Sequence, residues 1–154
     1  MDVGLVNPFI AATVDILEKV GSITANVQKP FRKTDPQGQG AISGIVAIKG
    51  KTTGTAAVTF SKKCILSIVS TMFGETVAEV NEEVKDAVGE ITNMISGLAT
   101  QLYEKDGFGL KAGLDQVLMG DGHQIPHLPR QTVLGIPVQT DKGELLIELC
   151  FKET

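Results

Sequence analysis

The sequence predicts an α+β domain in which two long helices and one short helix pack against an antiparallel sheet. Three observations support this fold class. Apolar residues recur at helical spacing near the N-terminus and again over residues 79–103. Runs of β-branched residues, separated by glycine-containing turns, lie between and after these helices. The resulting order of helix, two strands, two helices and three strands is typical of α+β domains with an antiparallel sheet.

The first helix is expected to begin at Asn7 and Pro8, because asparagine is a favourable N-cap and proline is tolerated at the first helical position. It should end near Gly21. The residues that recur at helical spacing between these points are Phe9, Ile10, Thr13, Val14, Leu17 and Val20.

A loop and a β-hairpin are expected after this helix. Prolines and glycines are frequent in residues 29–40, which predicts a loop, and residues 41–49 form a β-branched, apolar run typical of a strand. Residues 50–54 then predict the hairpin turn, and residues 55–60 predict the returning strand.

Two further helices follow the hairpin. Ser61 is expected to cap a short helix that Phe73 and Gly74 close. Its apolar positions are Cys64, Ile65, Ile68, Val69 and Met72. The next helix, from about Glu79 to Tyr103, is the longest periodic segment of the chain. Its apolar stripe, which is expected to face the core, comprises Val80, Val84, Ala87, Val88, Ile91, Met94, Ile95, Leu98 and Leu102.

The last third of the chain predicts three strands. Residues 110–119 are the first, and residues 120–122 read Gly-Asp-Gly and indicate a turn. Residues 130–140 and 144–151 are expected to form a hairpin around residues 141–143, where a glycine can adopt positive φ.

Composition and charge exclude several classes of protein. A length of 154 residues suits a single domain over residues 1–154 that needs no metal or disulfide to fold. The formal net charge of −4 argues against a nucleic-acid binder. Cys64 and Cys150 lack the spacing of a metal site and are expected to be buried, reduced thiols. Without a secretion signal or a membrane-spanning apolar run, we expect a cytoplasmic protein.

One face of the longest helix carries the candidate functional residues. At about 100° per residue, five positions cluster beside the apolar stripe: Glu83, Asp86, Glu90, Asn93 and Gly97. Glu90 and Asn93 are three residues apart, so their carboxylate and carboxamide lie side by side. Gly89 and Gly97 flank this pair, each at a cost of up to about 1 kcal/mol relative to alanine. A closely approaching partner, or close packing within the fold, would explain the glycines.

Residues 86–93 read Asp-Ala-Val-Gly-Glu-Ile-Thr-Asn, and they resemble the acidic-xxx-Glu-xx-Asn signature of the CheC, CheX and flagellar-switch phosphatase family. The resemblance extends over nearly the whole chain, from the helix that opens with Asn7-Pro8-Phe9 to the closing strands. The single Glu-xx-Asn copy favours the CheX branch, since CheC carries two. One departure is Gln116, which stands where CheC-type motifs place a proline; the nearest later proline is Pro126.

The resemblance implies a phosphatase that removes the aspartyl phosphate of a CheY-like receiver in chemotaxis signalling. It implies that Asn93 holds the attacking water in line with phosphorus and that Glu90 pairs with the receiver's active-site lysine. Asp86, Glu83 and Gly97 are then expected to contact the receiver. The resemblance also implies a homodimer, and Mg²⁺ that the phosphorylated receiver supplies, so that the phosphatase needs no cofactor of its own.

Other interpretations stay open at this point, because a Glu-xx-Asn pair on a solvated helix face is common. The chain could be a receiver-binding module without activity, or a structural subunit of a flagellar or signalling assembly. His123 and His127 flank Pro126 without an HExxH arrangement, which favours a surface loop over a metal site. No GxSxG elbow supports a serine hydrolase.

Overall fold

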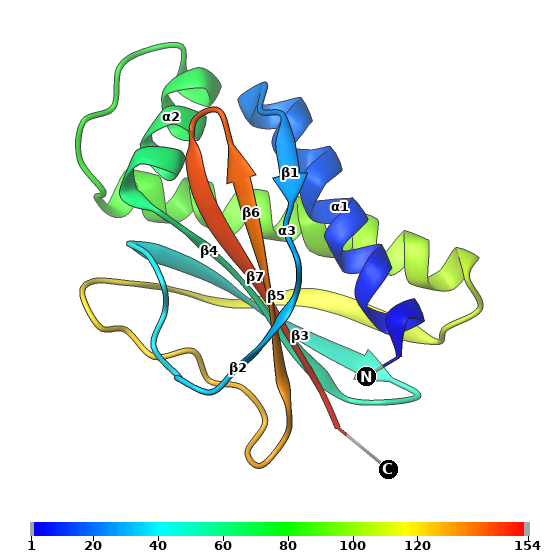
Figure 1. The fold of residues 1–154 in the computed structure, drawn as a ribbon. Helices are drawn as coiled ribbons and strands as arrows, with labels where there is room; N and C mark the ends of the chain where they lie inside the picture. The colour runs from blue at the N-terminus through cyan, green and yellow to red at the C-terminus, as the bar shows by residue number, and fades with distance from the viewer. Residues whose placement is uncertain (1, 153–154) are drawn as a thin grey trace.

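The fold is a seven-stranded antiparallel sheet with three helices on one of its faces, as the computed structural model of residues 2–152 shows (Figure 1). The helices are α1 (Val3–Gly21), α2 (Lys62–Phe73) and α3 (Glu82–Lys105). The strands are β1 (Ala25–Val27), β2 (Phe31–Lys33), β3 (Ile42–Gly50), β4 (Gly54–Phe60), β5 (Leu110–Met119), β6 (Val133–Thr140) and β7 (Gly143–Phe151). Their order in the sheet is β1-β6-β7-β4-β3-β5, and β2 also pairs with β6.

The predicted α+β class and most of the expected elements are confirmed. Ser61 caps α2, because its side-chain oxygen accepts a hydrogen bond from the N–H of Cys64 at 3.1 Å. Gly74 ends the same helix with a left-handed φ of 69°. Both hairpins form where they were expected, and Gly143 adopts a φ of 126° at the β6–β7 turn.

The expected start of the first helix was wrong. The helix α1 begins at Val3, because the side chain of Asp2 accepts a hydrogen bond from the N–H of Gly4 at 2.8 Å. Pro8 therefore stands inside the helix, where its missing N–H removes one backbone hydrogen bond. Burial of Phe9 and of Pro8 itself on the core side offsets that loss.

Two short strands, β1 and β2, were missed. Residues 29–40 were expected to be a loop, but β2 lies within them and pairs with β6. A three-residue strand is too short to show a period of two, so its position depends on the hydrogen bonds that the strand β6 offers. The ring of Phe31 lies over Gly135, and a Cβ at that position would overlap with the ring and displace it.

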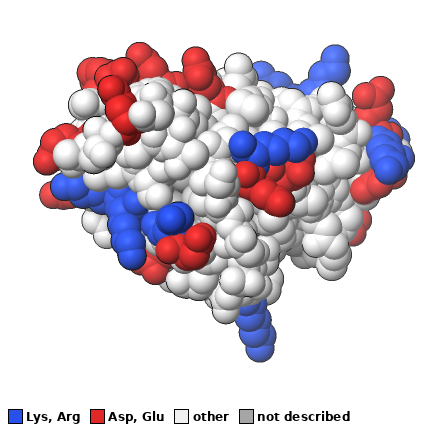
Figure 2. Space-filling view, turned by 90° about the horizontal axis from the view of Figure 1, so that it is seen from above, with Lys and Arg blue, Asp and Glu red and all other residues white. Residues whose placement is uncertain are grey.

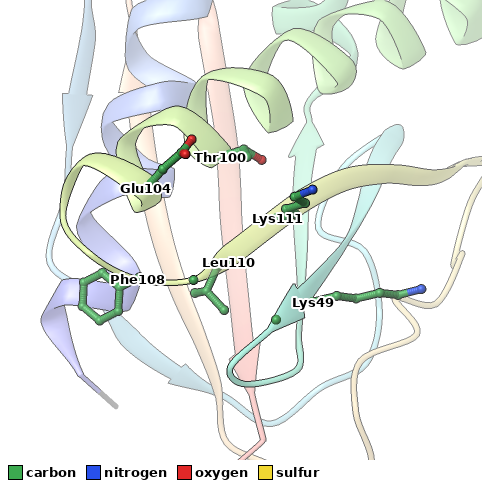
Figure 3. A pocket seen from close by; sticks show the side chains of 8 residues that line it. Lys49, Thr100, Glu104, Phe108, Leu110 and Lys111 are labelled. Atoms are coloured by element: carbon green, nitrogen blue, oxygen red, sulfur yellow. The ribbon is translucent and has the colours of Figure 1, made fainter.

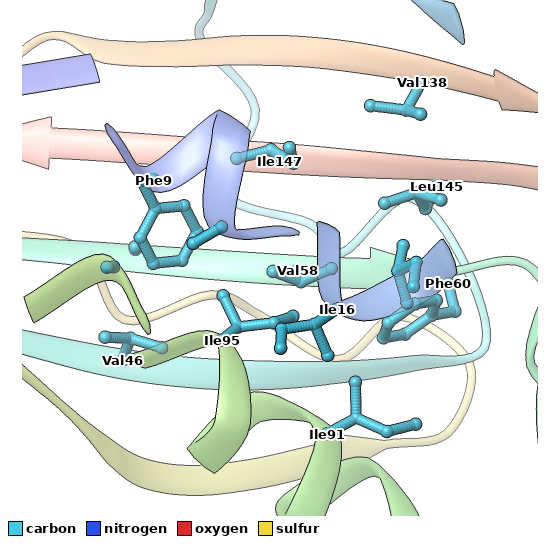
Figure 4. Close-up of a cluster of buried hydrophobic side chains, with 14 of the residues drawn as sticks. Phe9, Ile16, Val46, Val58, Phe60, Ile91, Ile95, Val138, Leu145 and Ile147 are labelled. Atoms are coloured by element: carbon cyan, nitrogen blue, oxygen red, sulfur yellow. The ribbon is translucent and has the colours of Figure 1, made fainter. Parts of the chain in front are cut away.

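The main core lies between the helices and the sheet (Figure 4). Phe9 and Ile16 reach it from α1, and Ile91 and Ile95 reach it from α3. The helix α3 also comes very close to β3, because a Cβ at Gly44 would overlap with the hydroxyl of Thr92. This close contact fixes one side of α3 against the sheet and leaves its opposite side to solvent.

The loop after β5 covers the other face of the sheet, on the side away from the helices (Figure 1). The prediction of a loop here is confirmed, but its two histidines do not simply face solvent. The His123 Nε2 atom is hydrogen-bonded to the Ser43 hydroxyl at 2.7 Å. His127, with only 7% of its side chain exposed, is bonded through Nδ1 to the Thr55 hydroxyl at 2.6 Å. Hydrogen bonds with Ser43 on β3 and Thr55 on β4 thus attach the loop to this face of the sheet.

Glu148 on β7 is the centre of a buried polar cluster under this loop. Its Oε1 atom lies 3.0 Å from Nε2 of His127 and 3.2 Å from Nζ of Lys33. None of the Glu148 side chain is exposed, and Lys33 also donates to the carbonyl groups of Asp35 and Gln37. Contact of Oε1 with Lys33 and His127 offsets part of the cost of removing a carboxylate and an ammonium group from water. The Oε2 atom of Glu148 is also buried, and it has no hydrogen-bond partner within residues 2–152.

Candidate functional site on helix α3

The outer side of α3 presents the five predicted site residues together. The helix begins after Asn81, whose side chain accepts a hydrogen bond from the N–H of Val84 at 3.0 Å, rather than near Glu79 as expected. Burial follows the predicted period, and the five residues all lie on the exposed side: Glu83, Asp86, Glu90, Asn93 and Gly97. The predicted exposed face is therefore confirmed, while the roles assigned to its residues stay predictions.

Glu90 and Asn93 form the centre of this surface. They are both exposed and lie one helical turn apart. Within residues 2–152, no hydrogen bond or ion pair holds either side chain. A carboxylate and a carboxamide are thus available side by side to a ligand outside the chain.

Met94 was expected in the core, and this was wrong. Its side chain is 43% exposed, although it continues the apolar pattern of the helix. Ile91 and Ile95 point into the core, whereas Met94 lies at the edge of the buried stripe, next to Asn93 on the helix surface. An apolar side chain therefore borders the polar pair.

Gly89 and Gly97 are not required by packing within the chain. A Cβ at Gly97 would meet nothing within 4 Å, and one at Gly89 would make ordinary contacts of 3.8 Å with Leu114 and Val117. Of the two explanations left open by the sequence, close packing within the fold does not account for these glycines. Their low helix propensity therefore fits a surface that something outside the chain approaches closely.

An open groove of about 390 Å³ runs beside the Glu90–Asn93 pair, between α3 and β5. One wall is α3 and the other is the outer strand of the sheet. The residues that line it are Lys85, Asp86, Gly89, Glu90, Asn93, Leu114 and Val117. The two candidate catalytic residues thus belong to a concave surface rather than to an isolated helix ridge. Sequence reasoning missed the β5 wall, since its residues come from a distant segment.

Acidic side chains surround the start of α3. Glu82, Glu83, Asp86 and Glu90 are exposed, and Lys85 is the half-buried basic residue among them. Figure 2 looks down on the molecule from above and shows acidic side chains gathered toward the side where α2 and the beginning of α3 lie. Such a surface favours a partner that carries positive charge.

A second hollow, of about 420 Å³, lies at the other end of α3 (Figure 3). Thr100 and Glu104 border it from the helix, and Phe108 and Leu110 border it from the segment that enters β5. Glu104 is fourteen residues beyond Glu90, which is about 21 Å along a helix axis. This hollow is therefore separate from the Glu-xx-Asn pair, and its lining is mainly apolar.

Gln116, where CheC-type motifs place a proline, lies in the outer strand β5 next to a β-bulge. Ile45 pairs with Gln116 and Val46 pairs with Leu114, so Asp115 has no partner on β3. A bulge interrupts the regular hydrogen bonding between two strands, and proline, which has no N–H to donate, is tolerated at such positions. The strand is therefore interrupted here without the proline.

Neither a membrane span nor a metal-binding cluster is found in the part of the chain that the structure describes. In residues 2–152, no helix combines the length and the apolar character needed to cross a bilayer. The same residues contain no group of three or more His, Cys, Asp and Glu side chains placed to hold a metal ion. The cysteines Cys64 and Cys150 are free and buried, as expected.

Comparison with known protein families matches residues 42–139 to the model described as chemotaxis phosphatase CheX. This region includes the whole of α3 and most of the sheet. Comparison with proteins of curated function gave no match.

Solved structures of this family are similar over nearly the whole chain. A CheC-like superfamily protein from Shewanella sp. PV-4 is 32% identical, with a TM-score of 0.90, covering 99% of this chain and 100% of the other. The chemotaxis protein CheX from Desulfovibrio desulfuricans is 35% identical, with a TM-score of 0.87, covering 96% and 99%. The Borrelia burgdorferi CheX-CheY-BeF3-Mg²⁺ complex matches at 20% identity and a TM-score of 0.77, covering 96% and 97%, which shows the fold alone. The chain belongs to the CheX family of chemotaxis phosphatases, within the CheC-like superfamily.

Proposed function

We propose that this chain is a single-domain cytoplasmic phosphatase that hydrolyses the aspartyl phosphate of a CheY-like receiver, with Asn93 and Glu90 acting in the receiver's active site. The observation that carries the proposal is the exposed Glu90–Asn93 pair, which has no partner within residues 2–152 and borders an open groove. Its position on α3 of a CheX-family chain supports the same conclusion.

Asn93 orients the attacking water in this proposal. A carboxamide both donates and accepts hydrogen bonds, so it can hold a water molecule in one orientation toward phosphorus. Phosphoryl transfer through a loose transition state depends mainly on alignment and electrostatic stabilisation, so no strong base is needed. The fixed backbone of α3 keeps the Asn93 side chain in register when the helix enters the receiver.

Glu90 pairs with a lysine of the receiver and sets the position of the inserted helix. Its carboxylate lies one turn before Asn93, and such a charge-assisted contact is directional enough to fix the approach. Asp86 and Glu83 extend the acidic surface toward the start of α3, and Gly97 allows close approach beyond Asn93.

Mg²⁺ belongs to the receiver in this proposal and enters the reaction with the acyl phosphate. The Borrelia burgdorferi complex, which contains CheX, CheY, BeF3 and Mg²⁺, supports such an arrangement. The residues of this chain then supply positioning only, namely an amide for the water and a carboxylate for the receiver's lysine.

A homodimer is the assembly that we propose for this phosphatase. In the described part of the chain, the ten-residue strand β5 pairs only with β3, so its other edge has no strand beside it. Such an edge is a ready surface for a second copy. Sedimentation equilibrium gives the mass directly, and a monomer at micromolar concentration would contradict the proposal.

The decisive experiment compares the decay of phosphorylated, Mg²⁺-loaded receivers from the same organism with wild type and with Asn93→Ala. Because Asn93 is exposed and its side chain makes no hydrogen bond within residues 2–152, the variant should fold normally yet lose about 100-fold or more of the acceleration. Gln101→Ala, two turns farther along the same exposed side, is the matched control and should keep the wild-type rate.

The same experiment separates activity from docking alone. Binding of a phosphorylated receiver without faster decay would show that the chain is a receiver-binding module. Faster decay that survives Asn93→Ala would retain the phosphatase but remove Asn93 from its mechanism.

A further inference from the structure

The wall of the groove opposite Glu90 is built by a β-bulge. In a regular strand, residues 114 and 117 would point to opposite faces, because side chains alternate. The unpaired Asp115 shifts the register, so that Leu114 and Val117 both turn toward α3. Each has a methyl carbon 3.8 Å from the position of a Cβ at Gly89, whereas Leu118 packs with Ile45 and Ala57 on the opposite face.

Gly89 forms the floor of this apolar part of the groove. A Cβ would fit there with ordinary contacts, so the fold does not demand glycine, and the helix would gain stability from a larger residue. The absence of a side chain leaves the space between Leu114 and Val117 open. Leu114 is 37% exposed, so part of its apolar surface is accessible from the groove.

From this geometry we infer that the bulged part of β5 and Gly89 form a socket for one apolar side chain of the receiver. The inference rests on the proposed function, because Glu90 and Asn93 line the same groove and would already be in contact with that partner. The socket consists of Gly89, Leu114 and Val117, and it determines how tightly the receiver is held rather than how fast the phosphate is hydrolysed.

The charges at the groove further define the side chain that enters it. Asp86, Glu90 and the half-buried Lys85 line the α3 wall, and the exposed residues Glu82 and Glu83 before them are acidic, so carboxylates outnumber the one ammonium group. The apolar side chain is therefore one that stands next to a basic residue on the receiver surface, because the basic group then meets Asp86. Occupancy of an apolar socket next to complementary charge is typical of contacts that dominate affinity.

The test fills the socket without harming the fold. Gly89→Leu places a side chain between Leu114 and Val117 and replaces a helical glycine, so the variant should unfold at the same or a higher temperature than wild type. Its dissociation constant for a Mg²⁺- and beryllofluoride-loaded CheY-like receiver should rise roughly 10-fold or more, the equivalent of one buried apolar side chain. Isothermal titration calorimetry measures this constant.

Leu114→Ala removes one wall instead of filling the space, and it should weaken binding in the same direction. Gln101→Leu is the control, because it adds the same side chain to the exposed side of α3 outside the groove. With receiver concentration varied, Gly89→Leu should raise KM and leave kcat within about 2-fold, while Asn93→Ala should lower kcat.

These outcomes distinguish the socket from the phosphatase proposal. Binding that Gly89→Leu weakens, in a protein that accelerates no receiver's decay, would support the socket and contradict the phosphatase. Binding by Gly89→Leu and Leu114→Ala within about 2-fold of wild type would overturn the socket, even if Asn93→Ala abolished activity.

Discussion

The exposed side of α3 and the loop-covered face of the sheet each carry a glutamate, Glu90 and Glu148. The two carboxylates differ in burial and in whether they have partners within residues 2–152. Glu148 is fully buried, and its Oε1 atom contacts both Lys33 and His127. Glu90 is exposed, and no side chain within residues 2–152 pairs with it. The Glu148 carboxylate attaches the loop to the sheet through His127, whereas the Glu90 carboxylate is available to another molecule.

This difference separates stability from function. A buried charge whose partner is removed keeps its desolvation cost, so substitutions in the Glu148 cluster should lower the free energy of unfolding. Substitutions at exposed residues without internal contacts usually change stability by less than about 0.5 kcal/mol. The comparison therefore predicts that stability and receiver phosphatase activity respond to different residues.

Glu148→Gln should produce the largest change in stability. Glutamine has nearly the same shape but no charge, so Lys33 would remain buried without its counter-ion. We expect the free energy of unfolding to fall by about 3 kcal/mol, measured by urea denaturation at pH 7. The control is Glu90→Gln, which should unfold at the wild-type urea concentration. Equal stabilities of the two variants would refute the distinction between the glutamates.

Alkaline pH should give the next largest fall in the free energy of unfolding, because buried Cys64 and Tyr103 are stable in the fold only in their neutral forms. Burial raises the pKa of the Cys64 thiol to about 11, with a smaller opposing effect of its hydrogen bond to Thr140. The usual value of 9.0 applies to the unfolded chain, so the unfolded state loses this proton first. Stability from Cys64 is therefore complete below pH 9 and falls by about 2 to 3 kcal/mol as pH rises to 11.

Urea unfolding at pH 8 and pH 10.5 measures this fall. Tyr103 adds to the fall once the pH passes 10, the usual pKa of tyrosine, because burial also raises the pKa of its hydroxyl. Cys64→Ala should be less stable than wild type at pH 8 but should lose less between the two pH values. A decline as steep in Cys64→Ala as in wild type would exclude the thiol as its cause.

The smallest expected effect is a gain in stability on the exposed side of α3. Gly97→Ala should raise the free energy of unfolding by up to about 1 kcal/mol, because a Cβ there meets nothing within 4 Å and alanine favours the helix. Gly44→Ala is the matched comparison, since its Cβ would overlap with Thr92 under the same helix, and it should lower stability by about 1 to 3 kcal/mol. Thermal unfolding followed by circular dichroism compares both variants, and a loss of stability in Gly97→Ala would contradict the prediction.

Much of the fold could be predicted because its signals are local. The period of α3 identified its buried stripe and placed Glu90 and Asn93 outside it, and Ser61, Gly74 and Gly143 marked boundaries that the structure confirms. The start of α1 could not be judged in the same way. Asn7-Pro8 is a favourable helix start, but the cap at Asp2 and the burial of Pro8 extend the helix before it.

The sequence by itself determined which residues share a helix face or a strand, since backbone geometry converts spacing into direction. It also contains the Glu90–Asn93 pair, on which the proposed receiver phosphatase activity depends. Only the tertiary structure decided which distant segments meet: β2 beside β6, His127 beside Glu148, and the bulged β5 beside Gly89. These contacts depend on the energies of packing and desolvation between segments, and such energies leave no periodic pattern along the chain.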